Sequence, residues 1–386
     1  MKRIYLDYNA TTPVHIEVFK AMKPYLTEKW GNPSSAHWAG ESIKEDIDNA
    51  RKSIATSLNC NSNEIFFTSC GTESNNWVIK SVVLNSNKKN KHIITTKVEH
   101  PAVLETCKFL EKIGIKITYL NVNEHGNLNI EEFENAINED TILISIMMAN
   151  NETGVTFPIE KLAEIAAKYN IPFHTDAVQA YGKEIIDLKN LKVDFLSISG
   201  HKVYSPKGIG ILFIRENNII EPLIHGGGQE KGLRSGTENV PYIIGLGKSA
   251  EIIMENFKNK KSKLIKKIRD RFEKFLFNNL ENISINGDIN HRLPNTTNIC
   301  FKNIETSALI KALSIEGIAV SAGSACASHK ESFSHVLKAM GKTKMEALSS
   351  IRVSLGDYSE ESEVLYAAER IVHWVKRLRQ FSPEKS

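Results

Sequence analysis

Short apolar runs with little polar alternation recur along residues 60–215, and such runs favour strands that are buried on both faces. Between them, residues 102–114 and 159–170 carry apolar side chains at helical spacing. This alternation predicts an α/β domain with a mostly parallel sheet. The predicted strands are EIFFTS (64–69), HIITT (92–96), IKITYLNV (115–122), TILISIMMA (141–149), IPFHT (171–175), VDFLSIS (193–199) and GIGILFI (208–214).

The pattern changes after residue 215. Residues 243–282 are predicted to form one long helical stretch, and the middle of this stretch, residues 258–271, is basic. A solvated helix face explains that charge, and an acidic protein partner is the alternative. Farther along, the pattern predicts short strands and two more helices, at residues 283–288, 296–301, 318–323, 307–317 and 363–380.

The different hydrophobic patterns before and after residue 215 predict two domains. We expect a large domain over residues 15–260, and a smaller α+β domain formed by residues 1–14 together with residues 261–386. A chain of 386 residues is long enough for both, and 41% hydrophobic with 24% charged residues is ordinary for a soluble enzyme. A net charge of +4 requires neither nucleic acid nor a membrane as the main partner.

The five cysteines are widely spaced, and no two of them form a CxxC pair. An odd number in this arrangement argues against a disulfide framework and against a zinc cluster, so no metal site is expected. The first residues, MKRIYLDYNATTP, lack an apolar signal segment, and no stretch approaches the length of a membrane span. We therefore expect a cytoplasmic, reduced protein.

Cys326 differs from an ordinary core cysteine, because its surroundings, AVSAGSACASH, contain no large side chain except the terminal histidine. A structural thiol usually packs among large apolar residues. A chance cysteine in a loop is the simple explanation, and a reactive, exposed thiol is the alternative.

The residues after the predicted strands hold most of the candidate chemistry, since ligands of open α/β sheets bind at the carboxyl ends of the strands. CGTESNN follows the first strand, and Gly71, Thr72 and Ser74 at a helix start would suit a phosphate. A plain helix cap is the alternative there. Polar residues that follow later strands are His100, Asn150, Asn151, Asp176, Gln179, Ser199, His201 and Lys202.

Each of these signals is weak alone, but together they place unusual chemistry along one sheet edge. An acid at the end of a buried strand needs a partner, and a lysine so close to a buried sheet is uncommon. A phosphate seat, a histidine, an acid and a lysine match the needs of pyridoxal phosphate (PLP), which uses a lysine for its Schiff base and an acid for its pyridinium nitrogen.

The chain also resembles the cysteine desulfurases of the NifS/IscS type, which are PLP-dependent members of the class-V aminotransferase family with an aspartate-aminotransferase-like fold (fold type I). The similarity runs nearly end to end. The matching motifs are LDYNATTP (6–13), GNPSSAH (31–37), TSCGTESNN (68–76), EHPAV (99–103), NNETG (150–154), TDAVQ (175–179), SGHKVYSPKGIG (199–210), GGGQEKGLRSGTENV (226–240), SAGSACAS (321–328) and IRVSLG (351–356).

This resemblance implies a role for each matching residue. Lys202 would form the Schiff base, Asp176 would pair with the pyridinium nitrogen, and His100 would stack on the cofactor ring. Gln179 would lie beside the ring hydroxyl. The implied phosphate contacts are Gly71, Thr72, Ser199, His201 and, from the neighbouring subunit of a homodimer, Thr237.

The resemblance further implies the substrate and the nucleophile. Asn151 and Arg352 would hold the carboxylate of L-cysteine, for which a guanidinium fork is well suited. Cys326, as a thiolate, would attack the substrate sulfur and keep it as a persulfide, while the remainder leaves as L-alanine. Lys202 or His100 would move protons, and His100 would act as the base that ionises Cys326.

Alternatives remain at this level. A selenocysteine lyase shares the PLP site but depends less on the thiol, and a PLP-bound scaffold would bind partners without turnover. The remaining cysteines, Cys60, Cys70, Cys107 and Cys300, are expected to be structural. The sulfur acceptor is open: iron–sulfur cluster assembly is expected, and tRNA or DNA thio-modification are the alternatives.

Overall fold

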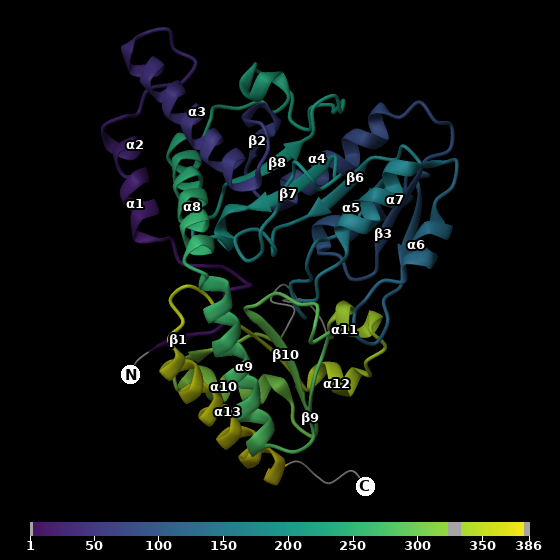
Figure 1. The fold of residues 1–386 in the computed structure, drawn as a ribbon, viewed down its shortest axis with the longest axis vertical. Coiled ribbons are helices and arrows are strands. Elements are labelled where there is room, and N and C mark those ends of the chain that lie inside the picture. The colour runs from purple at the N-terminus through teal and green to yellow at the C-terminus, as the bar shows by residue number, and fades with distance from the viewer. Residues whose placement is uncertain (1–2, 323–332, 382–386) are drawn as a thin grey trace.

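A seven-stranded sheet forms the centre of the larger part of the computed structural model, which describes residues 3–322 and 333–381 (Figure 1). The strand order is β2-β8-β7-β6-β5-β3-β4, and only β8 runs antiparallel to its neighbours. All seven predicted strands are confirmed. They are β2 (Ile65–Thr68), β3 (His92–Thr96), β4 (Lys116–Leu120), β5 (Thr141–Ser145), β6 (Phe173–Asp176), β7 (Phe195–Ser199) and β8 (Gly210–Ile214).

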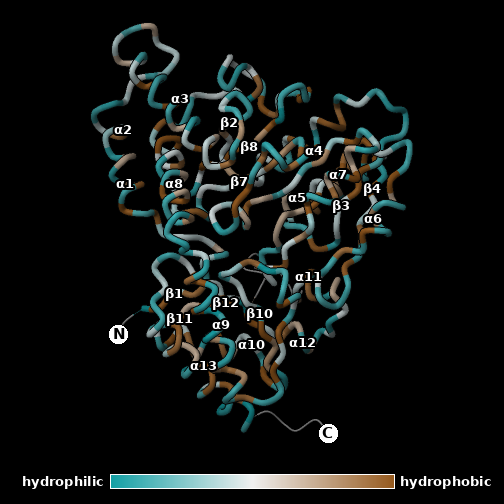
Figure 2. The backbone as a smooth tube through the Cα atoms, in the orientation of Figure 1, coloured by the Kyte–Doolittle hydropathy of each residue, from teal (hydrophilic) through white to brown (hydrophobic). Residues whose placement is uncertain are grey.

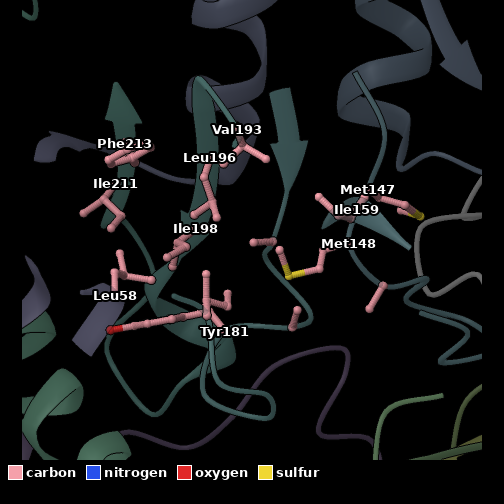
Figure 3. Close-up of a cluster of buried hydrophobic side chains, with 14 of the residues drawn as sticks. Leu58, Met147, Met148, Ile159, Tyr181, Val193, Leu196, Ile198, Ile211 and Phe213 are labelled. Carbon is pink, nitrogen blue, oxygen red and sulfur yellow. The ribbon is translucent and has the colours of Figure 1, made fainter. Parts of the chain in front are cut away.

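Successive residues of these strands pack on opposite faces of the sheet, which explains the uninterrupted apolar runs. Ile93 and Leu212 belong to one hydrophobic cluster, whereas Ile94 and Phe213, directly after them, belong to another. Figure 3 shows part of the second cluster, where side chains of β8 lie beside those of β7. The strands therefore need helices on both sides, as in other α/β folds.

Helices cover both faces of the sheet. The first cluster is closed by α4 (Gly71–Asn85) and α5 (Pro101–Glu111), and the second by α3 (Trp38–Leu58), α7 (Ile159–Lys168) and α8 (Val240–Lys258). The helices predicted from residues 102 and 159 are confirmed, with ends shifted by a few residues. The remaining elements of this part are α1 (Ile16–Met22), α2 (Pro24–Thr27), α6 (Ile130–Ala136) and three 3₁₀ turns, η1 (Ser62–Glu64), η2 (Gly200–Lys202) and η3 (Gln229–Gly232).

The elements in the lower part of Figure 1 share a third hydrophobic cluster, separate from the two clusters of the large sheet. Its antiparallel sheet has the order β12-β10-β9, and the N-terminal strand β1 pairs in parallel with β11. Ile4 and Leu6 belong to the same cluster as side chains from Ile265 to Val375. The elements here are β1 (Ile4–Tyr5), α9 (Lys261–Asn279), β9 (Ile283–Ile285), β10 (Thr296–Phe301), α10 (Thr306–Ile315), β11 (Ile318–Ala319), α11 (His335–Ala339), α12 (Lys344–Leu348), β12 (Ser350–Ser354) and α13 (Glu361–Phe381).

Two predictions from the hydrophobic pattern are corrected by the structure. The single helical stretch over residues 243–282 is two helices, α8 and α9, because the chain turns at Asn259 and Lys260, where Lys260 adopts a left-handed conformation with φ of 56°. No glycine or proline marks this break, so the sequence carries no local signal for it. Of the strand expected at 318–323, the structure describes residues 318–322, and only Ile318–Ala319 form a strand there.

Figure 2 shows hydrophobic positions gathered along the central strands, with hydrophilic positions frequent on the outer loops. Over the described residues, no helix has both the length and the apolar character that crossing a membrane requires. The buried hydrophobic side chains gather in the clusters described above, and the buried polar residues at the strand ends stand out against them.

Candidate active site

A cavity of about 480 Å³ lies at the carboxyl edge of the large sheet and extends to β12 of the small sheet. It brings together residues that are up to 343 positions apart, from Asn9 to Arg352. The predicted site residues that line it are Gly71, Thr72, His100, Asn151, Asp176, Gln179, Ser199, His201, Lys202 and Arg352. Residues that sequence placed after five different strands thus share one cavity.

One predicted phosphate contact, Thr237, lies away from this cavity. Thr237 is exposed in the loop before α8 and does not line the cavity of its own chain. This loop is fixed to α4 by Arg234, whose Nε donates to Glu73 Oε1 over 2.8 Å. Cys326 lies outside the described residues.

The first turn of α4 forms the predicted phosphate seat. The helix begins at Gly71 after Cys70, whose side chain makes no capping hydrogen bond, and early backbone N–H groups of a helix favour an anion. A Cβ atom on Gly71 would lie 2.7 Å from Cγ2 of Val178, so glycine permits the close approach. Ser74, grouped with this seat by sequence, is instead buried, with its hydroxyl donating to the carbonyl of Ile211 over 3.0 Å.

Thr72, Ser199 and His201 surround this seat with hydroxyl and imidazole groups. Thr72 is exposed on α4, whereas Ser199 is buried at the end of β7. His201 Nδ1 lies 3.1 Å from Thr11 Oγ1. Burial, assisted by the neighbouring Lys202 cation, lowers the pKa of His201 to about 4, so its imidazole is neutral near pH 7.

Asp176 ends β6 as a buried carboxyl group held by two hydrogen bonds. Its Oδ2 accepts from Asn75 Nδ2 over 2.7 Å, and its Oδ1 accepts from the Val178 N–H over 3.0 Å. Oδ1 of Asn75 is buried and has no hydrogen-bond partner among the described residues. A buried carboxyl group needs such donors, and the arrangement leaves Asp176 lining the cavity.

His100 is the N-cap of α5, as its position before Pro101 predicts. Nδ1 accepts from the backbone N–H of Ala102 over 3.1 Å, so the neutral ring carries its proton on Nε2. Burial lowers the pKa of His100; Asp176 opposes that shift, and Lys202 adds to it. The imidazole is therefore neutral near pH 7 and has an N–H to donate.

Lys202 lies in the 3₁₀ turn η2 directly after β7. Its Nζ donates to the carbonyl oxygens of Asn9 and Ala10, over 2.7 and 2.8 Å. The hydroxyl of Thr12 donates to the His201 carbonyl, which fixes the N-terminal segment against the same turn. Sequence singled out LDYNATTP as a matching motif without giving Asn9 and Ala10 a role, and the structure places both in the cavity wall.

Arg352 is a buried arginine of β12, and the cavity wall includes it. Its Nη2 donates to Asp7 Oδ1 over 2.7 Å, and its Nη1 donates to the carbonyl of Asn151 over 2.9 Å. These contacts fix the guanidinium plane and join the small sheet to the large one. Asn151, the other predicted substrate contact, is therefore adjacent to Arg352.

Sequence reasoning missed two side chains of the cavity that surround the N-terminus of α11. The first is His335, whose Nε2 donates to the carbonyl of Glu99 over 2.9 Å, so the neutral ring has its lone pair on Nδ1. The second is Glu152, a buried acid that accepts from the Ser334 hydroxyl and whose pKa is raised by burial. His335 follows no predicted strand, whereas Glu152 lies in the NNETG motif directly after Asn151 and was given no role there.

Three of the four described cysteines have the properties of structural thiols. Burial raises the pKa of Cys60 and of Cys107 to about 12 and also raises that of Cys300, so all three remain protonated thiols near neutral pH. Cys70 differs because it lines the cavity beside the phosphate seat.

The chemistry of these groups fits pyridoxal phosphate. A helix N-terminus with hydroxyl neighbours suits the phosphate, Asp176 suits a protonated ring nitrogen, and Lys202 supplies an amine for the aldehyde. Gly71 has no side chain, and a Cβ atom at this position would collide with Val178. The backbone at the start of α4 is therefore not covered by a side chain of residue 71.

Comparisons with known proteins agree with this geometry. The family model described as aminotransferase class-V matches residues 4–366. A "cysteine desulfurase IscS" from Dictyoglomus turgidum is 47% identical over 386 residues, covering 100% of this chain and 98% of that protein.

Solved structures give the same picture. A "NifS-like protein" has a TM-score of 0.92 at 42% identity, with 98% of this chain and 100% of that chain covered. "SspA in complex with cysteine" has a TM-score of 0.82 at 39% identity, with 93% and 100% covered. The family match over residues 4–366 and the 47% identity together establish that this chain belongs to the class-V aminotransferase family.

Proposed function

We propose that this chain is a PLP-dependent cysteine desulfurase, which releases L-alanine from L-cysteine and keeps the sulfur as a persulfide on Cys326. The observation that carries the proposal is the meeting of Lys202, Asp176, His100 and Arg352 in one cavity. These are an amine, an acid, a proton donor and a carboxylate-binding guanidinium. A relative that covers the whole chain at 47% identity is named a cysteine desulfurase, which supports the same activity.

The cofactor would be held by the residues at the strand ends. Thr72, Ser199, His201 and the backbone at Gly71 would bind its phosphate, and Asp176 would hold the proton of its ring nitrogen. When bound, PLP supplies an electron sink for the substrate carbon atoms. Asn75 fixes the orientation of the Asp176 carboxyl group through its 2.7 Å hydrogen bond.

The substrate would be held by the small sheet. Arg352 is fixed in place by Asp7 and by the carbonyl of Asn151, so its guanidinium is preorganised for the carboxylate of L-cysteine. Because Arg352 comes from β12 and Lys202 from the large sheet, substrate binding depends on both sheets.

Sulfur transfer then requires one bond to form and one to break. The Cys326 thiolate would form an S–S bond to the substrate sulfur, the carbon–sulfur bond would break, and the carbon would take up a proton. His100 carries its proton on Nε2 and suits the role of proton donor in this step. Lys202 would move the proton of the substrate Cα, as an amine close to the ring of the cofactor.

A matched pair of cysteine variants tests the nucleophile. Cys326→Ala should keep the visible absorption of bound PLP and lose alanine release from L-cysteine, since the cofactor site is intact. Cys60→Ala, which removes a thiol that does not line the cavity, should release alanine at the original rate. Alanine release by Cys326→Ala at the rate of the unmodified enzyme would exclude Cys326 as the sulfur acceptor.

We further propose a homodimer with shared sites, in which Thr237 of one subunit reaches the phosphate bound by the other. Thr237 is exposed, and the surface near α2 and α3 includes Trp30 and Trp38, which are 73% and 83% exposed. Large exposed aromatic residues are typical of interfaces. Sedimentation equilibrium should give twice the 43.3 kDa of the chain. A fully active monomer would contradict the proposal.

The sulfur would pass to an acceptor protein of iron–sulfur cluster assembly, in the cytoplasm. The matching NifS/IscS motifs and the cysteines without disulfides among the described residues support this view. Affinity purification from native cells should recover a cluster scaffold. Recovery of a nucleic-acid thiolation enzyme instead would change the proposed acceptor.

We also propose the division into a large domain, residues 15–260, and a small domain, residues 1–14 with 261–386.

A further inference from the structure

Lys183 is a second lysine beside the proposed cofactor site, and it is partly buried on the segment that follows β6. Its Nζ donates to Gln179 Oε1 over 2.8 Å and to Asn9 Oδ1 over 3.4 Å. Lys202 contacts the same residue from another direction, because its Nζ donates to the Asn9 carbonyl. The two lysine side chains therefore meet on Asn9.

The hydrogen bond from Lys183 determines which way the Gln179 amide points. An ammonium group only donates, so it requires the amide oxygen, and Nε2 must then point away from it. Nε2 donates to the Asn9 carbonyl over 3.0 Å and keeps a second N–H. Gln179 lines the cavity, so this orientation offers a donor and not an acceptor to a bound ligand.

We propose that Lys183 is a positioning residue, which fixes Gln179 as a hydrogen-bond donor to the ring hydroxyl oxygen of bound PLP and places a positive charge behind it. The inference rests on the proposed function, since it takes Gln179 as the neighbour of that hydroxyl group. Nothing in the sequence motifs assigns a role to Lys183, which lies four residues beyond Gln179.

The electrostatic surroundings of Lys183 determine the pH range in which it carries its positive charge. Burial, followed by the cations of Lys202 and Arg352, lowers the pKa of Lys183 to about 7. The same repulsion acts in the other direction, so a charged Lys183 disfavours a proton on the nitrogen of Lys202. A cavity of about 40 Å³ adjoins Lys183, and its other titratable side chains are Tyr8, Tyr181, Lys202, Tyr204, Lys261 and Asp357.

The backbone at Lys183 has hydrogen bonds that do not involve the ammonium group. The backbone of Lys183 is held separately, because its N–H donates to the Ala180 carbonyl and its own carbonyl accepts from the Ser262 hydroxyl. Methionine has a similar length and lacks the charge and the donors. We therefore expect Lys183→Met to fold and to bind PLP.

The test is a pH titration of the visible absorption of the PLP-loaded protein, which reports the proton shared by the ring hydroxyl and the attached lysine nitrogen. A donor to the hydroxyl oxygen and a nearby cation both disfavour that proton. Lys183→Met should therefore raise the midpoint by about one pH unit, an order-of-magnitude value for a lost charge at close range. Lys183→Arg, which keeps both properties, should return the midpoint most of the way.

Lys189→Met is the matched control, because Lys189 is exposed on the same segment, and it should titrate like the unmodified protein. If Lys183→Met does not retain PLP, Lys183→Gln takes its place, with a shift in the same direction. An unchanged midpoint in the variant with bound PLP overturns the role of Lys183 alone. An unmodified protein that develops no visible absorption with PLP overturns the proposed function, and this inference with it.

Discussion

His174 and Asp176 are two buried polar residues of the same strand, β6, and they show how the interior of the sheet differs from its carboxyl edge. His174 Nδ1 lies 2.8 Å from Ser145 Oγ, and its Nε2 lies 2.9 Å from Ser197 Oγ. Both ring nitrogens are thus occupied by the neighbouring strands. His174 therefore has no ring nitrogen left for a ligand.

Asp176, two residues farther along β6, has a different environment. Its carboxyl oxygens accept from Asn75 and from the Val178 N–H, and the residue still lines the cavity. Burial by itself therefore does not separate a structural polar residue from a functional one. The difference is whether neighbouring groups occupy all hydrogen-bonding atoms of the side chain or hold the side chain so that it faces the cavity.

The largest expected effect at the edge follows from Lys202→Ala. This change removes the amine that would react with the cofactor, so alanine release should fall by at least about 10³-fold. The melting temperature should change little, because Lys202 contributes to the site and not to any of the three hydrophobic clusters. Steady-state turnover and thermal unfolding measure the two effects. Near-normal turnover would remove Lys202 from the reaction.

Asp176→Asn should have the next largest effect. An amide keeps the shape of the carboxyl group but cannot hold a proton on the cofactor nitrogen by charge, so turnover should fall by about 10²-fold or more. In Asp176 both carboxyl oxygens accept, one from Asn75 Nδ2 and one from the Val178 N–H, whereas the asparagine amide oxygen can accept from only one of these donors and its NH2 group then faces the other. Turnover and the visible spectrum report the effect. A spectrum and rate equal to those of the unmodified enzyme would show that Asp176 has no such role.

The interior residue should respond to pH through stability and not through activity. Burial lowers the pKa of His174 to about 3, whereas an unfolded histidine titrates near 6.5. Between these values the unfolded chain binds one more proton, so the free energy of unfolding falls as pH falls, by about 1.4 kcal/mol per pH unit. Above pH 6.5 this contribution is fully present.

His174→Gln checks this assignment, since it removes the titrating ring and keeps polar atoms near Ser145 and Ser197. Denaturant unfolding at several pH values should show a shallower slope for the variant between pH 6.5 and 4, while other groups titrate equally in both proteins. Parallel pH profiles would mean that His174 is not the group responsible.

Gly71→Ala tests the carboxyl edge of the sheet by adding one methyl group at the proposed phosphate seat. The added Cβ would lie 2.7 Å from Val178 Cγ2, so either the Val178 side chain or the start of α4 must shift, and the affinity for PLP should fall by about tenfold. Titration with PLP followed by absorbance gives the affinity. Gly114→Ala is a poor control because Gly114 has a φ of 91°, but Gly228, whose added Cβ meets nothing within 4 Å, provides a suitable one. Equal affinities in the Gly71→Ala and Gly228→Ala proteins would argue against a phosphate seat at α4.

The sequence predicts the strands of the large sheet well, because apolar runs such as residues 92–96 and 193–199 are buried on both faces and have no other use. Strand ends then identify Asp176 and Lys202. The same reasoning fails where the signal is not local. Lys260 turns the chain between two helices without glycine or proline, and His335 reaches the cavity from α11, far from any strand end.

The positions of Asn9 and Lys183 also could not be predicted, because they depend on how the N-terminal segment crosses the large sheet. Asn9 contacts Lys202, Gln179 and Lys183, and none of these contacts leaves a periodic pattern. Patterns along the chain therefore identify groups that come directly from an element, whereas groups that support them become visible only when distant segments are placed together.

The central claim is that the residues at the carboxyl edge of the large sheet, with bound PLP, promote the transfer of sulfur from L-cysteine to Cys326. Peptide mass spectrometry of the PLP-loaded protein after brief incubation with L-cysteine tests it most directly. The account predicts one additional sulfur on the peptide that contains Cys326, together with released alanine. A Cys326 peptide of unchanged mass, with no alanine released by protein that visibly binds PLP, would contradict it.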